Sequence, residues 1–211
     1  MTGNSWLWNQ GTEQDWTEAW KKYERKLGRG GQSVRALDRY MEELREEDVE
    51  RMSVLEFYTF LHDKYFPWEF KQYLKKRQDD LARYVEEDDL KTLAEIQKNL
   101  FYIDHNYIER CLKNVMEIHG LGISGASGLL AVIFPREFGK VNQGVLEQLE
   151  SIENIPHGRE LSQIRSKTLN TKKAAVLIRI LREKAEELNM RFGTNFWTPR
   201  KIDMVLWAYE N

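Results

Sequence analysis

The sequence predicts an all-α protein, and three observations support this fold class. Apolar residues recur at helical spacing in successive segments that are bounded by capping residues and glycines. Runs of alternating Val, Ile and Thr, which are typical of strands, are nearly absent. Only four prolines interrupt the 211 residues, so long helices are feasible.

The length suits one domain or two small helical lobes. With 41% hydrophobic residues the chain can bury a core, and its 31% charged residues are mixed in sign, which is typical of solvated helix faces. We expect an N-terminal helical region over 1–100 and a second region over 101–211, which share one core and are partly discontinuous.

The first half is expected to form amphipathic helices over 15–27, 33–46, 53–67, 68–84 and 88–100. The glycine-rich segment 28–31 ends the first of them, because glycine is costly inside a helix. Ser53 and Glu56 form a capping box that opens the third helix. We expect this helix to stop near Pro67, since the residue before a proline disfavours the helical conformation.

Aromatic residues crowd the segment 57–68. Aromatic side chains at helical spacing usually belong to a core, so we interpret this segment as core and not as a base-stacking surface. His62 lies within it without a second His or Cys at ligand spacing, which favours a structural histidine over a metal ligand. The apolar stripe of the predicted helix comprises Leu55, Tyr58, Leu61 and Tyr65.

The second half is expected to form helices over 104–118, 124–134, 142–152 and 171–192. Gly193 stops the long helix over 171–192. A last helix begins with Thr198 as its cap and Pro199 at its first position.

Cys111 is the only cysteine, which excludes an internal disulfide and a four-cysteine zinc or iron–sulfur site. This cysteine usage favours a cytoplasmic location. We see no signal peptide and no stretch of roughly 18 uncharged apolar residues that could span a bilayer. We therefore expect a soluble protein without a membrane partner.

The formal net charge of −2 argues against coating of nucleic acid by bulk electrostatics, but it permits a local basic face. Residues 1–100 hold 17 basic and 21 acidic side chains, whereas residues 101–211 hold 15 and 13. Within 157–182 the only acidic residue is Glu160. A nucleic-acid partner is therefore expected to meet the second half. The basic residues of 157–182 are Arg159, Arg165, Lys167, Lys172, Lys173, Arg179 and Arg182.

The most informative segment is 118–130, where one helix ends, the chain turns through Gly120-Leu121-Gly122, and a second helix begins near Ser124. The glycines let the backbone reverse and keep the outside of the turn bare. Leu121 can fill the space between the two helices, and the small residues Gly125, Ala126 and Gly128 let them pack closely. The first amides of the second helix have no partner within it and carry the positive end of its dipole, so they suit a phosphate. A plain helical corner closed by glycines is the alternative.

This segment resembles the helix-hairpin-helix DNA glycosylase superfamily over about residues 104–152. The resemblance implies a helix-hairpin-helix, DNA-glycosylase-like helical bundle that binds DNA. Members carry a catalytic aspartate at the start of a later helix, and some carry a lysine just past the hairpin. Here Asn142 stands at the aspartate position and Ser124 at the lysine position. No cofactor is implied, other than a monovalent cation that the hairpin could hold.

Both departures bear on catalysis. The Ser124 hydroxyl cannot form a Schiff base. Asn142 is neutral and cannot take a proton from water, and we interpret it as the cap of the helix that begins at Gln143. A displaced carboxylate could come from Glu137 or Glu147, and the sequence singles out neither.

Further cations could assist at the DNA backbone. Lys140 could reach a phosphate or remain a solvated surface lysine. The run 165–173 includes Lys172 and Lys173 at a helix start, where cations oppose the dipole unless an anion is bound. The predicted DNA-backbone-binding residues are Gly120, Leu121, Gly122, Ser124, Lys140, Lys172 and Lys173.

Three functions remain open. The first is a DNA-binding protein of glycosylase-like fold that recognises duplex backbone or damage without excising a base. The second is a monofunctional DNA glycosylase in base-excision repair. The third is a protein-interaction module, in which the acidic first half forms the binding face. Motifs of phosphate loops, zinc proteases and serine hydrolases are absent.

Overall fold

The computed structural model describes residues 3–27, 32–164, 166 and 168–209. These residues form helices joined by turns and no strand, which confirms the all-α class. None of the described helices has the length and apolar character that crossing a membrane requires. The glycine-rich segment 28–31 and the basic residues Arg165 and Lys167, on which predictions above depend, lie outside the described residues.

The helices of the first half are α1 (Gly3–Gln10), α2 (Glu13–Leu27), α3 (Gln32–Glu43), α4 (Glu46–Glu50), α5 (Val54–Phe60), the π-helical turn η1 (Leu61–Tyr65), α6 (Phe66–Glu69), α7 (Leu74–Glu86) and α8 (Leu90–Tyr102). Those of the second half are α9 (Ile108–Met116), α10 (Ile123–Ile133), α11 (Gln143–Glu150), α12 (Gly158–Gln163), α13 (Thr171–Phe192) and α14 (Pro199–Tyr209). The short helices α1, α4 and α12 were not predicted, because none presents a sustained helical repeat of apolar residues.

Local capping chemistry sets several helix ends where the sequence predicts them. The Ser53 hydroxyl accepts a hydrogen bond from the Glu56 amide at 3.3 Å, and the Glu56 carboxylate accepts one from the Ser53 amide at 2.7 Å. The Thr198 hydroxyl accepts a hydrogen bond from the Lys201 amide at the start of α14. Gly193 ends α13 in the left-handed conformation, with φ of 63°.

The helix that begins at Val54 ends at Glu69, so the predicted stop near Pro67 holds to within two residues. In η1 the Phe66 amide donates to the carbonyl of Leu61, five residues back, and Pro67 follows this π-helical turn directly. The next helix begins only at Leu74, so the predicted helix over 68–84 is wrong at its start.

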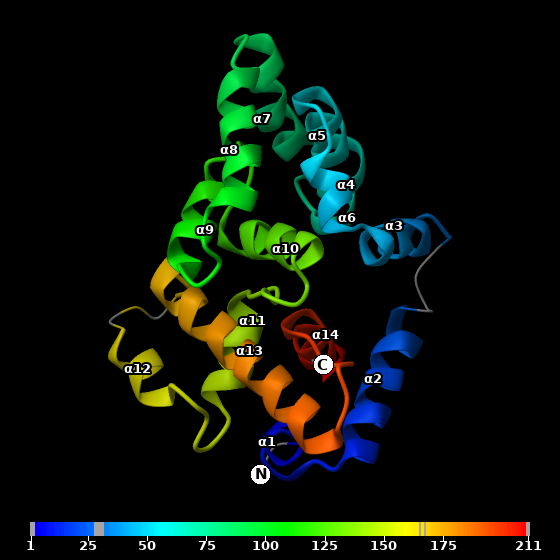
Figure 1. Cartoon of the computed structure of the whole chain (residues 1–211), viewed down its shortest axis with the longest axis vertical. Helices are drawn as coiled ribbons and strands as arrows, with labels where there is room; N and C mark the ends of the chain where they lie inside the picture. The colour runs from blue at the N-terminus through cyan, green and yellow to red at the C-terminus, as the bar shows by residue number, and fades with distance from the viewer. Residues whose placement is uncertain (1–2, 28–31, 165, 167, 210–211) are drawn as a thin grey trace.

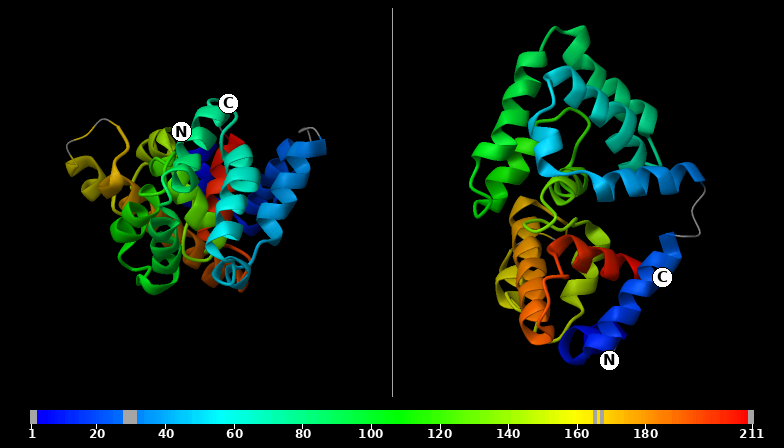
Figure 2. Two further views of the ribbon diagram at one scale, coloured as in Figure 1. Left: turned by 90° about the horizontal axis from the view of Figure 1, so that it is seen from above. Right: turned by 45° about the vertical axis from the view of Figure 1, so that its right-hand side comes forward.

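The helices fall into two groups with α10 between them (Figure 1). Helices α3 to α9 form the upper group, and α1, α2 and α11 to α14 form the lower one, which contains both ends of the described chain. Figure 2 shows α2 beside α14, and these two helices are in contact. Each group therefore contains helices from both 1–100 and 101–211, and one apolar core runs through both groups.

The aromatic segment 57–68 contributes to that core, as predicted. Phe57, Phe60, Tyr65 and Phe66 are all buried. Leu55, assigned to the same apolar stripe, is instead 57% exposed. It lies in the first turn of α5, before the helix packs fully against its neighbours.

Candidate nucleic-acid interface

The hairpin turn between α9 and α10 requires glycine at position 120. Gly120 has φ of 89°, a left-handed conformation that side chains disfavour. A Cβ at this position would also lie 2.9 Å from the carbonyl oxygen of Arg77 and 3.2 Å from the ring of Phe66. Leu121 is buried beside the turn, as the sequence predicts. The hairpin is thus fixed against the upper group of helices.

Gly122 is the exposed N-cap of α10. It offers no side chain to cap the helix, and a Cβ there would meet nothing within 4 Å. The amides of the first turn, those of Ile123, Ser124 and Gly125, have no partner within the helix. The outer side of the turn is therefore an open, uncapped helix N-terminus, with Ser124 partly exposed on it.

Two of the small residues that follow, Gly125 and Gly128, face the segment 65–70 of the upper group. The Tyr65 hydroxyl donates to the Gly125 carbonyl at 2.5 Å. A Cβ at position 128 would lie 2.8 Å from that hydroxyl and 3.2 Å from the carboxylate of Glu69.

A basic segment of the first half flanks the hairpin. A Cβ on Gly125 would lie 3.2 Å from the ring of Phe70, and the Arg77 carbonyl lies against Gly120, so both ends of the segment 70–77 contact the turn. The Arg77 guanidinium lies 5.4 Å from the centre of the Phe70 ring. The exposed cations of this segment are Lys71, Lys75 and Lys76.

The start of α7 has the feature that was predicted for 165–173, namely lysines in the first turn of a helix. No acidic residue occupies its first turn, and its N-cap, Tyr73, makes no side-chain cap. Lys75 and Lys76 oppose the helix dipole there, which a bound anion would offset, and Lys75 also pairs with Asp79 at 3.2 Å. The sequence pattern does not predict this site, because it places 71–77 inside a continuous helix. The concentration of basic residues over 71–77 is the sequence feature that could have indicated this site.

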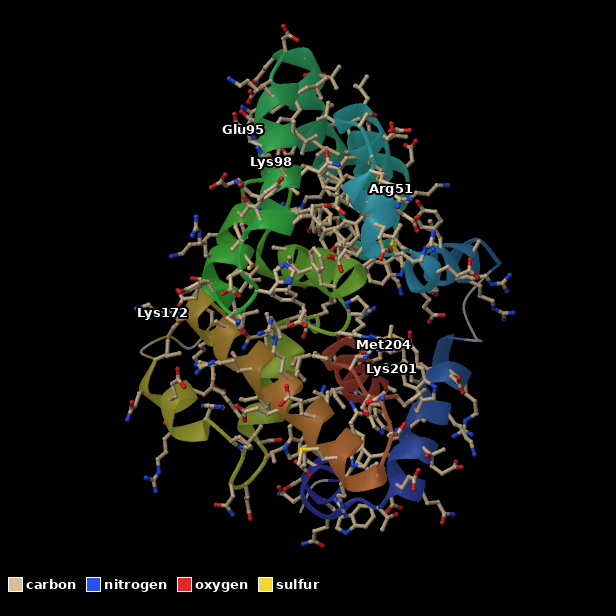
Figure 3. The ribbon with its side chains drawn as sticks, in the orientation of Figure 1. Arg51, Glu95, Lys98, Lys172, Lys201 and Met204 are labelled. Carbon is tan, nitrogen blue, oxygen red and sulfur yellow. The ribbon has the colours of Figure 1, made fainter. Side chains whose placement is uncertain are left out.

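The start of α13 is less available than expected. The Asn170 side chain caps it by accepting a hydrogen bond from the Lys173 amide at 2.9 Å. Lys173 is buried, and its ammonium lies 2.8 Å from the carboxylate of Glu150. Lys172 is exposed at the outer end of α13 (Figure 3). Of these two lysines, only Lys172 presents its charge to the surface.

Lys140 is partly buried between the two groups of helices, with 24% of its side chain exposed. Its ammonium is 2.7 Å from the carboxylate of Glu69, whose side chain is 4% exposed. Its backbone amide donates to the carboxylate of Asp203 at 2.6 Å. Lys140 thus links Glu69 of α6 with Asp203 of α14, although these two residues lie far apart in the sequence.

Lys140 and Asn142 line a cavity of about 590 Å³ between the two groups. Its wall is rich in aromatic side chains, contributed by Tyr23, Trp68, Phe70 and Trp207. Among its charged groups, Arg200 and Asp203 form an ion pair at 2.7 Å. Burial raises the pKa of Asp203, and the Arg200 guanidinium acts in the opposite direction. This cavity cannot be predicted from the sequence, because its lining residues come from distant segments.

Asn142 caps α11, as predicted. Its side-chain oxygen accepts a hydrogen bond from the Val145 amide at 2.8 Å. Glu137 pairs with Arg182 and Glu147 accepts from Gln143, and neither glutamate lines the cavity. The carboxylates that do line it belong to Asp38, Glu69 and Asp203.

No protein-family model, no curated protein and no solved structure matches this chain.

Proposed function

We propose that this protein binds duplex DNA through its phosphate backbone. The binding surface, here called the hairpin surface, comprises Gly120, Gly122, Ser124, Lys71, Lys75 and Lys76. One observation carries the proposal: the exposed, uncapped N-terminus of α10 lies beside a cluster of cations at the uncapped start of α7.

Each component suits a phosphate. Free amides at a helix N-terminus donate hydrogen bonds to an anion, and the helix dipole favours its charge. Lysines beside the turn add affinity through release of the counterions that surround DNA. Lys172 remains a predicted contact outside the hairpin surface. Lys140 and Lys173 are omitted from the proposal, because both pair with carboxylates and are largely buried, whereas the side chain of Lys75, which lies 3.2 Å from Asp79, is 90% exposed.

The proposal is recognition without base excision. Asn142 is occupied as a helix cap, and its amide carries no charge to stabilise a sugar cation. Ser124 cannot form a Schiff base. The resemblance of 104–152 to glycosylases therefore supports DNA binding more strongly than catalysis.

The test is a salt titration of labelled duplex DNA, followed by fluorescence anisotropy. A triple variant that replaces Lys71, Lys75 and Lys76 with Gln removes three cations from the hairpin surface. If each contacts one phosphate, the slope of log affinity against log salt should fall by about 2.7, which is three times about 0.9. The control removes the same charge from exposed lysines elsewhere, at Lys21, Lys91 and Lys98.

The control triple variant should keep the wild-type slope. Equal slopes for wild type and both triple variants would show that DNA does not contact the hairpin surface. An equal loss of salt slope in both triple variants would mean that DNA binding depends only on the overall charge of the protein.

A monofunctional DNA glycosylase is the second candidate function. The cavity favours it, because the buried carboxylates of Glu69 and Asp203 line the same cavity as Asn142. A base-release assay on duplexes with damaged bases separates the two functions. Release by wild type, abolished in Glu69→Gln, would establish the glycosylase. The DNA-binding proposal expects no release by wild type or by Asn142→Asp.

A further inference from the structure

A groove of about 480 Å³ lies between the start of α9 and the first half of α13, two helices that are in contact. Its floor is apolar, because Ile108 and Ala175 line it and both are buried. Tyr107 also lines the groove, and 65% of this residue is exposed. This site, here called the α9 groove, therefore presents apolar and aromatic surface to a ligand.

The α9 side of the groove is basic. Among the described residues, no carboxylate pairs with the exposed Arg110. The Lys113 ammonium lies 4.0 Å from the carboxylate of Glu109, and both side chains are well exposed. Exposed ion pairs of this kind are weak, so they leave the cations available to a competing carboxylate. The charged residues that line the groove are Glu109, Arg110, Lys113 and Arg179.

The α13 side of the groove carries the same sign of charge. Arg179 is partly exposed and pairs with Glu160 of α12, whose side chain is also exposed. Lys172 is exposed at the start of α13, one helical turn before Ala175 of the groove floor (Figure 3). Both walls therefore attract a negatively charged ligand.

The start of α9 adds hydrogen-bond donors to this positive charge. Its N-cap residue, Tyr107, makes no side-chain cap. The amides of Ile108 and Glu109 belong to the first turn and have no partner within the helix. The positive end of the helix dipole at these amides also favours an anion. The α9 groove thus combines an apolar floor with basic walls and free backbone donors.

We propose that the α9 groove binds a short acidic segment of a partner protein, with an apolar side chain on the floor and carboxylates on the walls. The guanidinium groups of Arg110 and Arg179 suit carboxylates, which they can bind through two parallel hydrogen bonds. Arginine and tyrosine are also enriched in protein interfaces. The apolar floor favours a peptide over nucleic acid, because a phosphate backbone is charged along its length and has no apolar group to place there.

The α9 groove is separate from the hairpin surface. The groove lies at the start of α9, and the hairpin follows the end of this helix of nine residues. At about 1.5 Å per residue, roughly 13 Å separate the two ends. DNA and a partner protein can therefore be bound at the same time, and the inference does not depend on the proposed DNA binding.

The experiment selects a phage-displayed library of random peptides on the immobilised full chain. The selected sequences should place Asp and Glu around an apolar residue. The most enriched peptide is then synthesised with a fluorescent label, and anisotropy gives its affinity. A double variant that combines Arg110→Glu with Lys113→Glu should bind this peptide about tenfold or more weakly, because two attractive charges become repulsive. Tyr107→Ala should also weaken binding, through loss of the exposed aromatic contact.

The matched control combines Lys21→Glu with Lys91→Glu, which changes the net charge equally on α2 and α8. Lys21 is a fair counterpart of Lys113, because it too belongs to an exposed ion pair, with Glu18. The control should bind the peptide as wild type does. Unfolding in urea checks that both double variants are folded. If the charge reversal unfolds the chain, Arg110→Gln combined with Lys113→Gln replaces it, and a loss of peptide affinity is again expected.

The inference is overturned if the selection yields no acidic sequences, or if both double variants lose peptide affinity equally. It is also overturned if labelled duplex DNA displaces the peptide and binds the α9 groove variant more weakly, because the groove would then belong to the DNA surface. The DNA-binding proposal is judged separately, by the salt slope of the hairpin-surface variants.

Discussion

Gly122→Glu places a negative charge where we propose that DNA phosphate binds. A Cβ at this position meets nothing within 4 Å, and its φ of −107° suits any residue. The substitution should therefore preserve the fold. A carboxylate at a helix N-terminus is itself favourable by about 0.3–1 kcal/mol, so the free energy of unfolding should stay equal or rise slightly.

The effect on DNA binding can be worked out from charge separation. A carboxylate near the free amides of α10 would lie roughly 4 Å from a phosphate bound to the same amides. Two unit charges at this distance repel by about 1 kcal/mol in water and about 4 kcal/mol at a protein surface of lower effective dielectric. An intermediate repulsion of about 2 kcal/mol would weaken DNA binding roughly 30-fold. The loss of one phosphate contact should also lower the salt slope by about 0.9.

The assay is fluorescence anisotropy of labelled duplex across a salt titration, with Gly122→Gln as the control of matched size. The glutamine variant separates the effect of bulk from the effect of charge. Unfolding in urea checks that both variants are folded. The reasoning is refuted if Gly122→Glu and Gly122→Gln bind DNA with the same affinity and the same salt slope as wild type.

Three further predictions concern the fold around the site. Asn142→Ala should lower the free energy of unfolding by about 1 kcal/mol and Asn142→Asp should not, because only alanine removes the cap of α11; unfolding in urea measures both. Lys173→Ala should destabilise the protein by about 1–2 kcal/mol because it removes a buried side chain and its ion pair with the half-exposed Glu150, whereas Lys172→Ala should change stability by less than about 0.5 kcal/mol; equal effects in urea unfolding would contradict this. Burial raises the pKa of Cys111 to about 11, so the thiolate is scarce near neutral pH. Labelling of the native thiol by a disulfide reagent should be slow and should accelerate about tenfold per pH unit until about pH 11, and rapid labelling at pH 8 would show that the thiol is exposed.

The sequence by itself determined the helical class and those helix ends that depend on neighbouring residues. The capping box of Ser53 and Glu56, the Asn142 cap and the Gly193 stop all join groups within one helical turn, so they follow from spacing alone. The bare glycine turn at 120–122 is of the same kind, since a glycine at the N-cap leaves the first amides of α10 without a side-chain cap.

Only the tertiary structure decided which charges are available at the surface. Lys140 pairs with Glu69, 71 positions away, and Lys173 pairs with Glu150, 23 positions away. In the sequence both lysines are indistinguishable from the exposed Lys172. The basic segment 71–77 became a candidate because a helix break before Leu74 brings it against the hairpin. Ion pairs and surface clusters depend on contacts between distant segments, and the spacing of residues along a chain carries no record of those contacts.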